Sequence, residues 1–397
     1  MTKSWTFYSA GQVVFGSGVI ADIGELTKRH GFKKTLLVTD KTLVETGAVG
    51  AVQNSFERVG VKIEVFAGGE PEPSIQVAEA AAEVARSFQP DAVVGIGGGS
   101  NMDLAKCVAV LYAHGGSPVD YFGYDKVPGP VLPIICVPTT AGTGSEVSHS
   151  AVLTDLENEM KVSMLSNFLR PLMAVVDPRL TLSCPPKVTA DSGIDALVHA
   201  IEAYTAKDFD EMGEPLGYQG RFPITDSVAE KAIRLVGSNL ITAYKEPDNL
   251  EARENMALAA TLGGMAFSNA GVALVHALEY PMGGALHCSH GAGNGLLLPY
   301  VMRFNLPTRK EAFGRIASLL GQDLDGLSGD ETAQSAIEAV EDLRCRIGIP
   351  ERIRDLGGRE EQLPVFAEKA FALDRLKGVN PREATLEDLE QILRDAF

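Results

Sequence analysis

The order of strand-like and helical segments is the feature that most limits how this chain can fold. In the first half, short apolar runs typical of strands alternate with helical stretches. These runs are 36–38, 63–66, 91–96, 132–137 and 173–176. Strands that alternate with helices pair in parallel through right-handed crossovers, so the first half predicts an α/β fold.

After about residue 185 the strand-like runs stop and helical patterns take over. The predicted helices are 191–204, 225–244, 249–267 and 271–280, with more helix toward the C-terminus. A polar segment rich in glycine and proline, 207–223, interrupts them and is expected to be a loop. We therefore predict an α/β domain at 1–185 and an all-helical domain at 186–397; one large α/β domain is the alternative.

Composition excludes several classes of partner. The chain has 397 residues and a formal net charge of −17, which disfavours nucleic acid and anionic membranes because both require a basic face. Its five cysteines include no Cys-x-x-Cys pair, which predicts a reducing compartment without a disulfide framework. No apolar stretch approaches the roughly 20 residues that span a bilayer, and the N-terminus lacks a targeting pattern, so we expect a cytoplasmic protein.

Three glycines, Gly97 to Gly99, separate a predicted strand from a predicted helix in DAVVGIGGGSNMDLAK, 91–106. Glycines let backbone approach a phosphate closely, and the N–H groups that begin a helix favour an anion such as a pyrophosphate. Ser100 is expected as the helix N-cap, with Asp103 at the third helical position in an arrangement close to a capping box. Because many such turns bind nothing, the motif alone does not establish a nucleotide site.

Two further segments strengthen the nucleotide hypothesis. The loop PTTAGTGSE, 138–146, follows a strand and is rich in hydroxyl groups. Asp40 ends an early strand, where an acid would bind a ribose 2′-hydroxyl and repel a 2′-phosphate. A helix N-cap or turn is an equally good interpretation of Asp40 alone. The glycines follow a later strand rather than the first, which differs from the usual Rossmann fingerprint.

The helical half carries residues suited to a divalent metal. Asp195 and His199 are four residues apart, which places them one turn apart on one helix face. His276 and His290 follow in a glycine-rich segment. Each histidine alone is better explained as a structural residue, but the four side chains together predict one metal site. Three imidazoles and a carboxylate suit iron, zinc, manganese or cobalt, so ligand types do not select the metal.

Four motifs give the chain its resemblance to a known family. They are GGGSNMDLAK, PTTAGTGSEV, DSGIDALVHAIEAY and NAGVALVHALEYPMGGALHCSHGAGNGLLLPYV. Over nearly its whole length the chain resembles the iron-containing (group III) alcohol dehydrogenase family. This implies a Rossmann-like N-terminal domain and a helical metal-binding domain, the dehydroquinate synthase-like architecture, with the active site in the cleft between them. It also implies Fe²⁺, or alternatively Zn²⁺ or Mn²⁺, bound by Asp195, His199, His276 and His290.

The same resemblance implies an NAD site. Its expected lining is Gly98, Gly99, Ser100, Thr139, Thr140 and Lys161, with Asp40 favouring NAD over NADP. Asp103, Thr143 and Ser145, from the same two motifs, complete the predicted cofactor-binding set. From its sequence context alone, Lys161 would be a surface lysine.

Two departures from the family pattern bear on chemistry. Many members have a histidine four residues after the first signature histidine, where this chain has Tyr280. We therefore expect Tyr280 or His287 to pass the proton to solvent. The segment YQGRFPITD, 218–226, resembles the hydroxyacid-oxoacid transhydrogenase branch. Its Arg221 is a candidate to bind a substrate carboxylate, and a solvated loop arginine is the alternative.

The predicted function is a metal-dependent, NAD-linked oxidoreductase acting on a small primary alcohol or an ω-hydroxyacid such as 4-hydroxybutyrate. The metal would act as a Lewis acid on the alcohol as hydride moves to the nicotinamide. One alternative is a transhydrogenase with tightly held NAD, and a more remote one is a metal- and NAD-dependent lyase of the same fold. The expected partners are a small-molecule substrate and further copies of the chain, in a dimer or larger homo-oligomer, with neither nucleic acid nor membrane.

Overall fold

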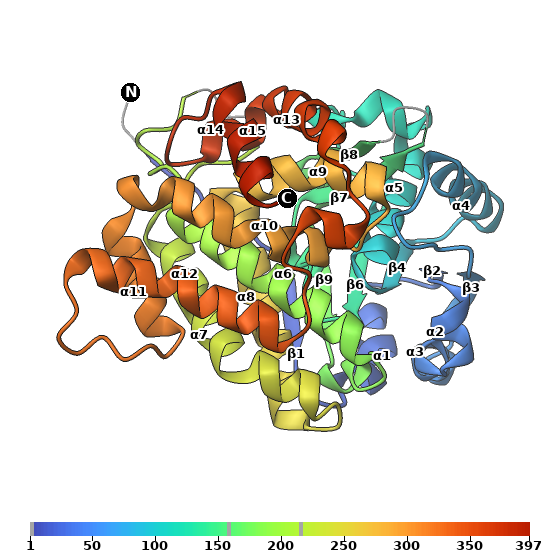
Figure 1. Ribbon diagram of the computed structural model, residues 1–397. Coiled ribbons are helices and arrows are strands. Elements are labelled where there is room, and N and C mark those ends of the chain that lie inside the picture. The colour runs from blue at the N-terminus through green and yellow to red at the C-terminus, as the bar shows by residue number, and fades with distance from the viewer. Residues whose placement is uncertain (1–3, 157–159, 214–216) are drawn as a thin grey trace. The chain divides into compact units, whose positions relative to one another are not determined.

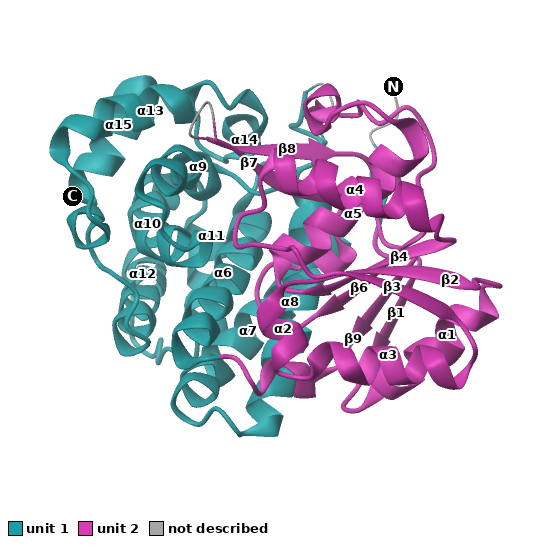
Figure 2. Ribbon diagram, turned by 90° about the vertical axis from the view of Figure 1, so that its right-hand side faces the viewer, with its two compact units in different colours: residues 1–8, 185–397 teal, residues 9–184 magenta. Residues whose placement is uncertain are grey.

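A computed structural model describes residues 4–156, 160–213 and 217–397. The chain divides into an α/β unit, Ser9–Cys184, and a helical unit that begins at Pro185 (Figure 2). The N-terminal segment up to Tyr8 groups with the helical unit, which the sequence did not lead us to expect. The backbone N–H groups of Thr6 and Tyr8 donate to side chains of that unit, Gln219 at 2.9 Å and Asn269 at 2.8 Å.

The α/β unit contains a six-stranded sheet in the order β1-β9-β6-β4-β2-β3, and every strand pair is parallel (Figure 1). The strands are β1 Gln12–Phe15, β2 Lys34–Val38, β3 Lys62–Phe66, β4 Ala92–Gly97, β6 Ile134–Pro138 and β9 Met173–Val176. The predicted parallel α/β architecture is confirmed.

Helices cover both faces of this sheet because its central strands are apolar on both sides. They are α1 Ile23–Arg29, α2 Lys41–Glu45, α3 Ala48–Arg58, α4 Ile75–Phe88 and α5 Gly99–His114. Leu36 and Val93 belong to one core with α4 and α5. Their neighbours in sequence, Leu37 and Val94, belong to the other core with α3. Side chains alternate along a strand, so two cores form on one sheet.

The strand order reverses between β2 and β4. From β2 the chain moves outward to β3, whereas β4, β6 and β9 follow one another in the opposite direction. In open α/β sheets, ligands bind beyond the carboxyl ends of the strands at such a reversal. Asp40 follows β2, Gly98 follows β4 and Thr139 follows β6, so this edge collects the predicted nucleotide residues.

A second sheet of three strands, in the order β5-β8-β7, was not predicted. Its strands are β5 Gly123–Tyr124, β7 Ser150–Asp155 and β8 Met160–Leu165. Lys106 of α5 connects to the start of this region by donating from Nζ to the carbonyl oxygens of Ser145 at 2.8 Å and Ser150 at 2.7 Å. Asp103 accepts from the backbone N–H of Val152 at 3.0 Å, which ties β7 to the same helix.

The helical unit is built around α6, which packs against α7, α8 and α10. Its helices are α6 Pro186–Thr205, α7 Pro223–Lys245, α8 Leu250–Ala270, α9 Leu274–Leu286, α10 His290–Asn305, α11 Lys310–Leu319, α12 Gly329–Arg346, α13 Leu363–Phe371, α14 Asp374–Val379 and α15 Leu386–Asp395. Both units also contain short 3₁₀ turns. In the α/β unit they are η1 Val19–Asp22, η2 Pro118–Tyr121, η3 Ser145–Val147, η4 Asn167–Leu169 and η5 Pro178–Thr181. In the helical unit they are η6 Leu306–Thr308, η7 Ile353–Leu356 and η8 Glu360–Gln362. The all-helical character predicted for this half is confirmed.

The prediction for the fourth helix needs correction. It was expected over 271–280, but α9 begins at Leu274 and continues through Pro281 to Leu286. Proline removes one backbone hydrogen bond and usually ends or kinks a helix. Here Leu278 and Met282 on either side of it are fully buried, so packing of the apolar helix outweighs the lost bond.

Parts of the predicted loop 207–223 also have defined structure. Asp208 and Arg221 form an isolated parallel bridge, and residues 214–216 lie outside the described residues.

Among the described helices, none taken alone has the length and hydropathy needed to cross a bilayer. Helices α8 and α9, which are bent by 104° relative to each other, meet that test only as a pair.

Candidate metal centre and nucleotide site

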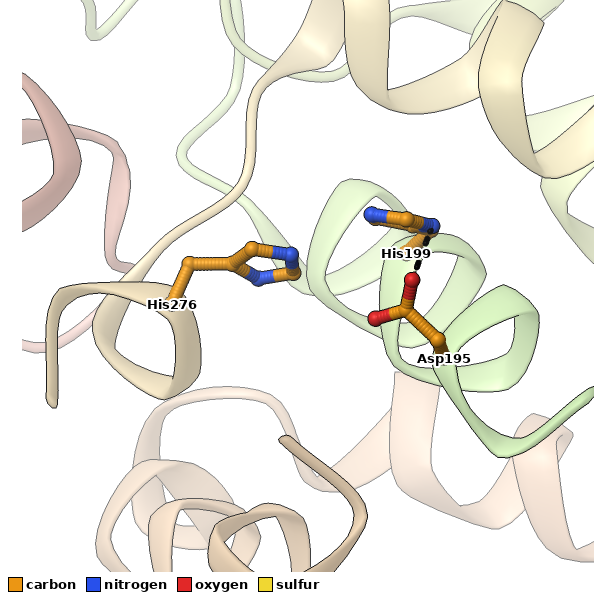
Figure 3. Close-up of side chains that lie close together, drawn as sticks. All are labelled: Asp195, His199 and His276. Atoms are coloured by element: carbon orange, nitrogen blue, oxygen red, sulfur yellow. Dashed lines mark ion pairs between the residues drawn. The ribbon is translucent and has the colours of Figure 1, made fainter. Parts of the chain in front are cut away.

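Three helices of the helical unit bring the predicted metal-ligand residues together. Asp195 and His199 lie on α6, His276 on α9, and His290 is the first residue of α10. Asp195, His199 and His276 each present a ligand atom within 4.8 Å of the other two. Figure 3 shows these three side chains pointing toward one another. His290 lies beside them, with its Nε2 4.0 Å from Asp195 Oδ1. The cluster is therefore compact and, apart from the partly exposed His290, buried.

Glycines on α10 allow this close approach. A Cβ built on Gly291 would lie 1.9 Å from the carbonyl oxygen of Asp191 on α6, and one on Gly295 would lie 2.8 Å from the Ile194 side chain. A Cβ on Gly293 would lie 2.9 Å from Glu279 Cγ on α9. Since no side chain fits at these positions, the glycines of HGAGNG set the spacing between the helices that carry the cluster.

Two buried glutamates orient two of the three imidazoles, and neither glutamate was predicted from the sequence. Glu202 Oε2 accepts from His276 Nδ1 at 2.5 Å, and Glu279 Oε2 accepts from His290 Nδ1 at 2.6 Å. Glu202 also accepts from the backbone N–H of Val275 at 2.7 Å. With Nδ1 donating to a carboxylate, each ring presents its Nε2 lone pair toward the cluster, as metal-binding histidines do.

A spacing in the sequence could have revealed these glutamates. Glu202 follows His199 by three residues and Glu279 follows His276 by three, so each lies one turn from a predicted ligand. Glu202 on α6 nevertheless pairs with His276 on α9, and Glu279 on α9 pairs with His290 on α10. Sequence spacing alone does not show these pairings.

The remaining two side chains are held by stacking and by charge. The His199 ring stacks on Phe267, with ring centroids 4.3 Å apart, and its Nδ1 lies 3.9 Å from Asp195 Oδ2. Burial alone would raise the pKa of the Asp195 carboxyl. The surrounding imidazoles in their protonated form, led by His199, and a hydrogen bond from Asn294 outweigh that effect, so the pKa lies below its ordinary value.

This donor set fits a divalent transition metal. Three imidazoles and one ionised carboxylate are ligands that iron, zinc and manganese accept. The carboxylates behind His276 and His290 and the burial of the cluster are the surroundings such sites require.

The glycine turn and the loop after β6 lie against each other in the α/β unit. The backbone N–H of Thr139 donates to the Gly97 carbonyl at 2.9 Å. A Cβ on Gly99 would lie 2.8 Å from Thr143 Cγ2, and one on Gly98 would lie 3.5 Å from Thr140 Oγ1. The turn and the threonines thus line one surface at the carboxyl edge of the sheet.

The predicted cap of α5 was wrong. The N-cap is Gly98, and Ser100 is the second helical residue, whose Oγ accepts from the backbone N–H of Glu72 at 3.2 Å. A glycine cap leaves the first N–H groups of the helix without a capping side chain, which suits an anion site.

Asp103, Ser145 and Lys161 have structural partners. Ser145 Oγ donates to Asp103 Oδ1 at 2.6 Å, and both residues are nearly buried. Lys161 is only 4% exposed and pairs with Glu72 at 2.8 Å, so its interpretation as a surface lysine was wrong. Contact between these three residues and a nucleotide stays a prediction.

Asp40 caps α2 and also reaches the glycine turn. Its Oδ1 accepts from the backbone N–H of Leu43 at 3.0 Å, which is the N-cap alternative considered above. Its Oδ2 accepts from Asn101 Nδ2 at 2.7 Å, and Asn101 belongs to the first turn of α5. The carboxylate is thereby fixed next to the glycine turn at the strand-order reversal, and its ribose contact stays a prediction.

The predicted proton-transfer residues lie differently. Tyr280 is 6% exposed, and its ring centroid lies 6.5 Å from that of His276 and 6.2 Å from that of His290. His287 is exposed, at the C-cap of α9, in the left-handed conformation. Of these two residues, only Tyr280 has ring contacts with the cluster among the described residues.

Arg221 forms a two-pronged ion pair with Asp226. Its Nε and Nη2 lie 3.1 and 2.7 Å from the two carboxylate oxygens, and its guanidinium lies 5.0 Å from the centre of the Tyr204 ring. The alternative of a solvated loop arginine was therefore wrong. The two N–H groups that could bind a substrate carboxylate, those of Nε and Nη2, already bind Asp226.

A parallel sheet with a glycine turn at its reversal point and a buried Asp–His cluster together define a class of metal- and nucleotide-dependent enzymes. Comparison with known proteins identifies the member of this class. Residues 10–178 match the family model described as iron-containing alcohol dehydrogenase, and residues 189–397 match the one described as Fe-containing alcohol dehydrogenase family, C-terminal. The chain belongs to the iron-containing alcohol dehydrogenase family and is an oxidoreductase.

Individual relatives agree along the whole chain. It is 40% identical to a 1,3-propanediol dehydrogenase of Citrobacter freundii, with 96% of both chains covered. It is 37% identical to an NAD-dependent methanol dehydrogenase of Bacillus methanolicus, with 97% of both covered. Among solved structures, a 1,3-propanediol oxidoreductase superposes with a TM-score of 0.93 at 38% identity, covering 99% of this chain and 100% of the other.

Proposed function

We propose that this protein is an NAD-linked dehydrogenase that uses a divalent metal to interconvert a small primary alcohol and its aldehyde. The observation that carries the proposal is the convergence of Asp195, His199 and His276 within 4.8 Å, with His290 adjacent. When bound there, Fe²⁺, or alternatively Zn²⁺ or Mn²⁺, supplies Lewis-acid activation of the alcohol hydroxyl.

The chain's own residues prepare this chemistry. Asp195 contributes an ionised carboxylate, because the pKa of its carboxyl is held below the ordinary value. Glu202 and Glu279 fix the rings of His276 and His290. Burial of Asp195, His199 and His276 limits competing water, which strengthens electrostatic interactions at the reacting centre. Tyr280, next to two of the proposed ligands, is our candidate for passing the hydroxyl proton toward solvent.

NAD is the proposed hydride acceptor. Its pyrophosphate would lie at the glycine-capped start of α5, against Thr140 and Thr143, and its ribose near Asp40. A relative that is 37% identical is named for its dependence on NAD, which supports the same choice here.

Two relatives support a primary alcohol as the substrate, because they are named for methanol and 1,3-propanediol. Arg221 was the candidate to bind the carboxylate of an ω-hydroxyacid, and its guanidinium already pairs with Asp226. The transhydrogenase alternative, which rested on sequence resemblance, stays an alternative. We therefore favour uncharged alcohols. Cytoplasmic location and a dimer or larger homo-oligomer stay predictions.

The proposal is tested by following NADH absorbance with anaerobically purified, Fe²⁺-loaded protein. Methanol, 1-propanol, 1,3-propanediol and 4-hydroxybutyrate are compared at equal concentration, and the diol and simple alcohols are expected to exceed the hydroxyacid. His199→Ala should abolish turnover because a missing ligand removes the metal. His30→Ala, at an exposed histidine of the α/β unit, is the control and should keep it. Full turnover by folded His199→Ala would refute the proposed site.

A further inference from the structure

Asn294 lies among the proposed ligands and has no role assigned so far. Its Nδ2 lies 2.8 Å from Asp195 Oδ1, 3.1 Å from His290 Nε2 and 3.2 Å from His276 Nε2. The residue is completely buried and follows His290 by one turn of α10. One amide nitrogen therefore contacts side chains from α6, α9 and α10.

The surroundings determine which end of the amide faces the cluster. His276 and His290 donate from Nδ1 to glutamates, so their Nε2 atoms are acceptors, as is Asp195 Oδ1. Three acceptors around one atom require a donor, which the amide nitrogen is and the amide oxygen is not. Asn294 Oδ1 is buried and has no hydrogen-bond partner within the described part of the chain. Since a buried unpaired carbonyl is unfavourable, contacts of the donor end set this orientation.

An amide nitrogen cannot itself bind a cation, because its lone pair is delocalised and it carries two hydrogens. It can, however, fix the atoms that do. One N–H satisfies Asp195 Oδ1 over the shortest of the three distances, and the other lies between the two imidazole nitrogens.

We propose that Asn294 is a positioning residue of the metal centre, which keeps Asp195, His276 and His290 converged on one point. The inference rests on the proposed metal-dependent function. A bound cation would use the imidazole lone pairs, whereas Asp195 Oδ1 has lone pairs for both an ion and the amide N–H. The hydrogen bond from Asn294 to Asp195 is therefore compatible with a bound metal and would keep the carboxylate oriented toward it.

Loss of the Asn294 amide should lower the metal affinity, and the effect should not be limited to the stability of the fold. Removing a side chain that orients metal ligands typically lowers metal affinity about 10–100-fold. Two variants separate the hydrogen bonds from the packing: Asn294→Ala removes both, whereas Asn294→Leu fills a similar volume without donors.

A matched control lies on the same helix. Asn305, at the end of α10, is buried and exchanges side-chain hydrogen bonds of 2.8 Å with Asn380. Asn305→Ala therefore removes a buried amide from α10 without touching the cluster.

The experiment measures Co²⁺ affinity by competition with a chelator and records the Co²⁺ absorption spectrum, alongside thermal unfolding. Wild type and Asn305→Ala should bind alike, and both Asn294 variants should bind about 10–100-fold more weakly, with a changed spectrum. Unchanged or tighter Co²⁺ binding by the Asn294 variants would overturn this inference while leaving the metal centre intact. If wild type itself binds no Co²⁺, Zn²⁺ or Fe²⁺, the proposed function fails, and this inference with it.

Discussion

At the scale of single residues, each proposed ligand has its own buried support. Glu202 holds His276, Glu279 holds His290, Phe267 stacks on His199, and Asn294 holds Asp195. Such contacts fix side-chain rotamers before a metal binds, so affinity depends on the supporting residues as well as on the ligands.

We expect Glu279→Ala to lower the metal affinity about 10–100-fold, because the His290 ring loses the carboxylate that fixes its tautomer. Glu279→Gln should recover much of the affinity, since its amide oxygen still accepts from Nδ1. Chelator competition measures both, with Glu251→Ala at an exposed position of α8 as control. Equal affinity for Glu279→Ala and wild type would show that His290 needs no support from Glu279.

We expect the choice between NAD and NADP to depend on another carboxylate, that of Asp40. NADP would place its 2′-phosphate near this group, and like charges at contact cost several kcal/mol, so the wild type should strongly prefer NAD. Asp40→Ser removes the charge but keeps an oxygen that can cap α2. The variant should therefore narrow the preference, chiefly through KM for NADP. If the ratio of kcat/KM for the two cofactors does not change, Asp40 is only a helix cap.

At the scale of elements, α5 links the parallel sheet to the small second sheet. Lys106 Nζ reaches Ser145, Ser148 and Ser150, and Asp103 accepts from Ser145 and Val152. Burial raises the pKa of the Asp103 carboxyl and lowers that of the Lys106 ammonium, so each charge depends on its partners.

Lys106→Ala should reduce the free energy of unfolding by about 3–5 kcal/mol, because the buried carboxylate of Asp103 loses the cation beside it. Denaturant unfolding measures the change. Lys28→Ala, in the last turn of α1 at an exposed position, should change it little. A loss below about 1 kcal/mol for Lys106→Ala would mean that the network contributes little to the stability of this unit.

Thiol chemistry tests the packing of α5 and β6. Burial raises the pKa of the Cys107 and Cys136 thiols to about 12, so neither forms a thiolate at pH 8. Iodoacetamide followed by mass spectrometry should find alkylation of exposed Cys345 in the native protein and none at Cys107 or Cys136. Rapid modification of either buried thiol would contradict the core described here.

The elements also show which information the sequence carried. The central strands were predictable because they are continuous apolar runs followed by turns. β7 and β8 were missed because polar residues interrupt their apolar pattern (SAVLTD and MKVSML), so neither is a continuous apolar run. α9 was cut short at Pro281 because local propensity predicts a break there, whereas burial keeps the helix intact.

For the site, residue type and helix spacing were enough to propose Asp195, His199, His276 and His290. Glu202, Glu279 and Asn294 were missed because each acts on a ligand that is distant in sequence, or on several ligands at once. Their importance follows only from the tertiary arrangement of α6, α9 and α10.

At the level of the whole molecule, the two units have different proposed roles. We propose that the α/β unit binds the nucleotide at its strand-order reversal and that the helical unit binds the metal. The family assignment extends over both, from residue 10 to residue 397. We propose that alcohol oxidation requires one metal ion in the helical unit of each chain.

The most direct test is an anaerobic titration of chelator-treated protein with Fe²⁺, with NADH formation from 1,3-propanediol measured at each addition. We predict no activity at zero metal, a linear rise that ends near one equivalent per chain, and no rise at these concentrations for His290→Ala. Full activity in protein shown by elemental analysis to contain no metal would contradict the account.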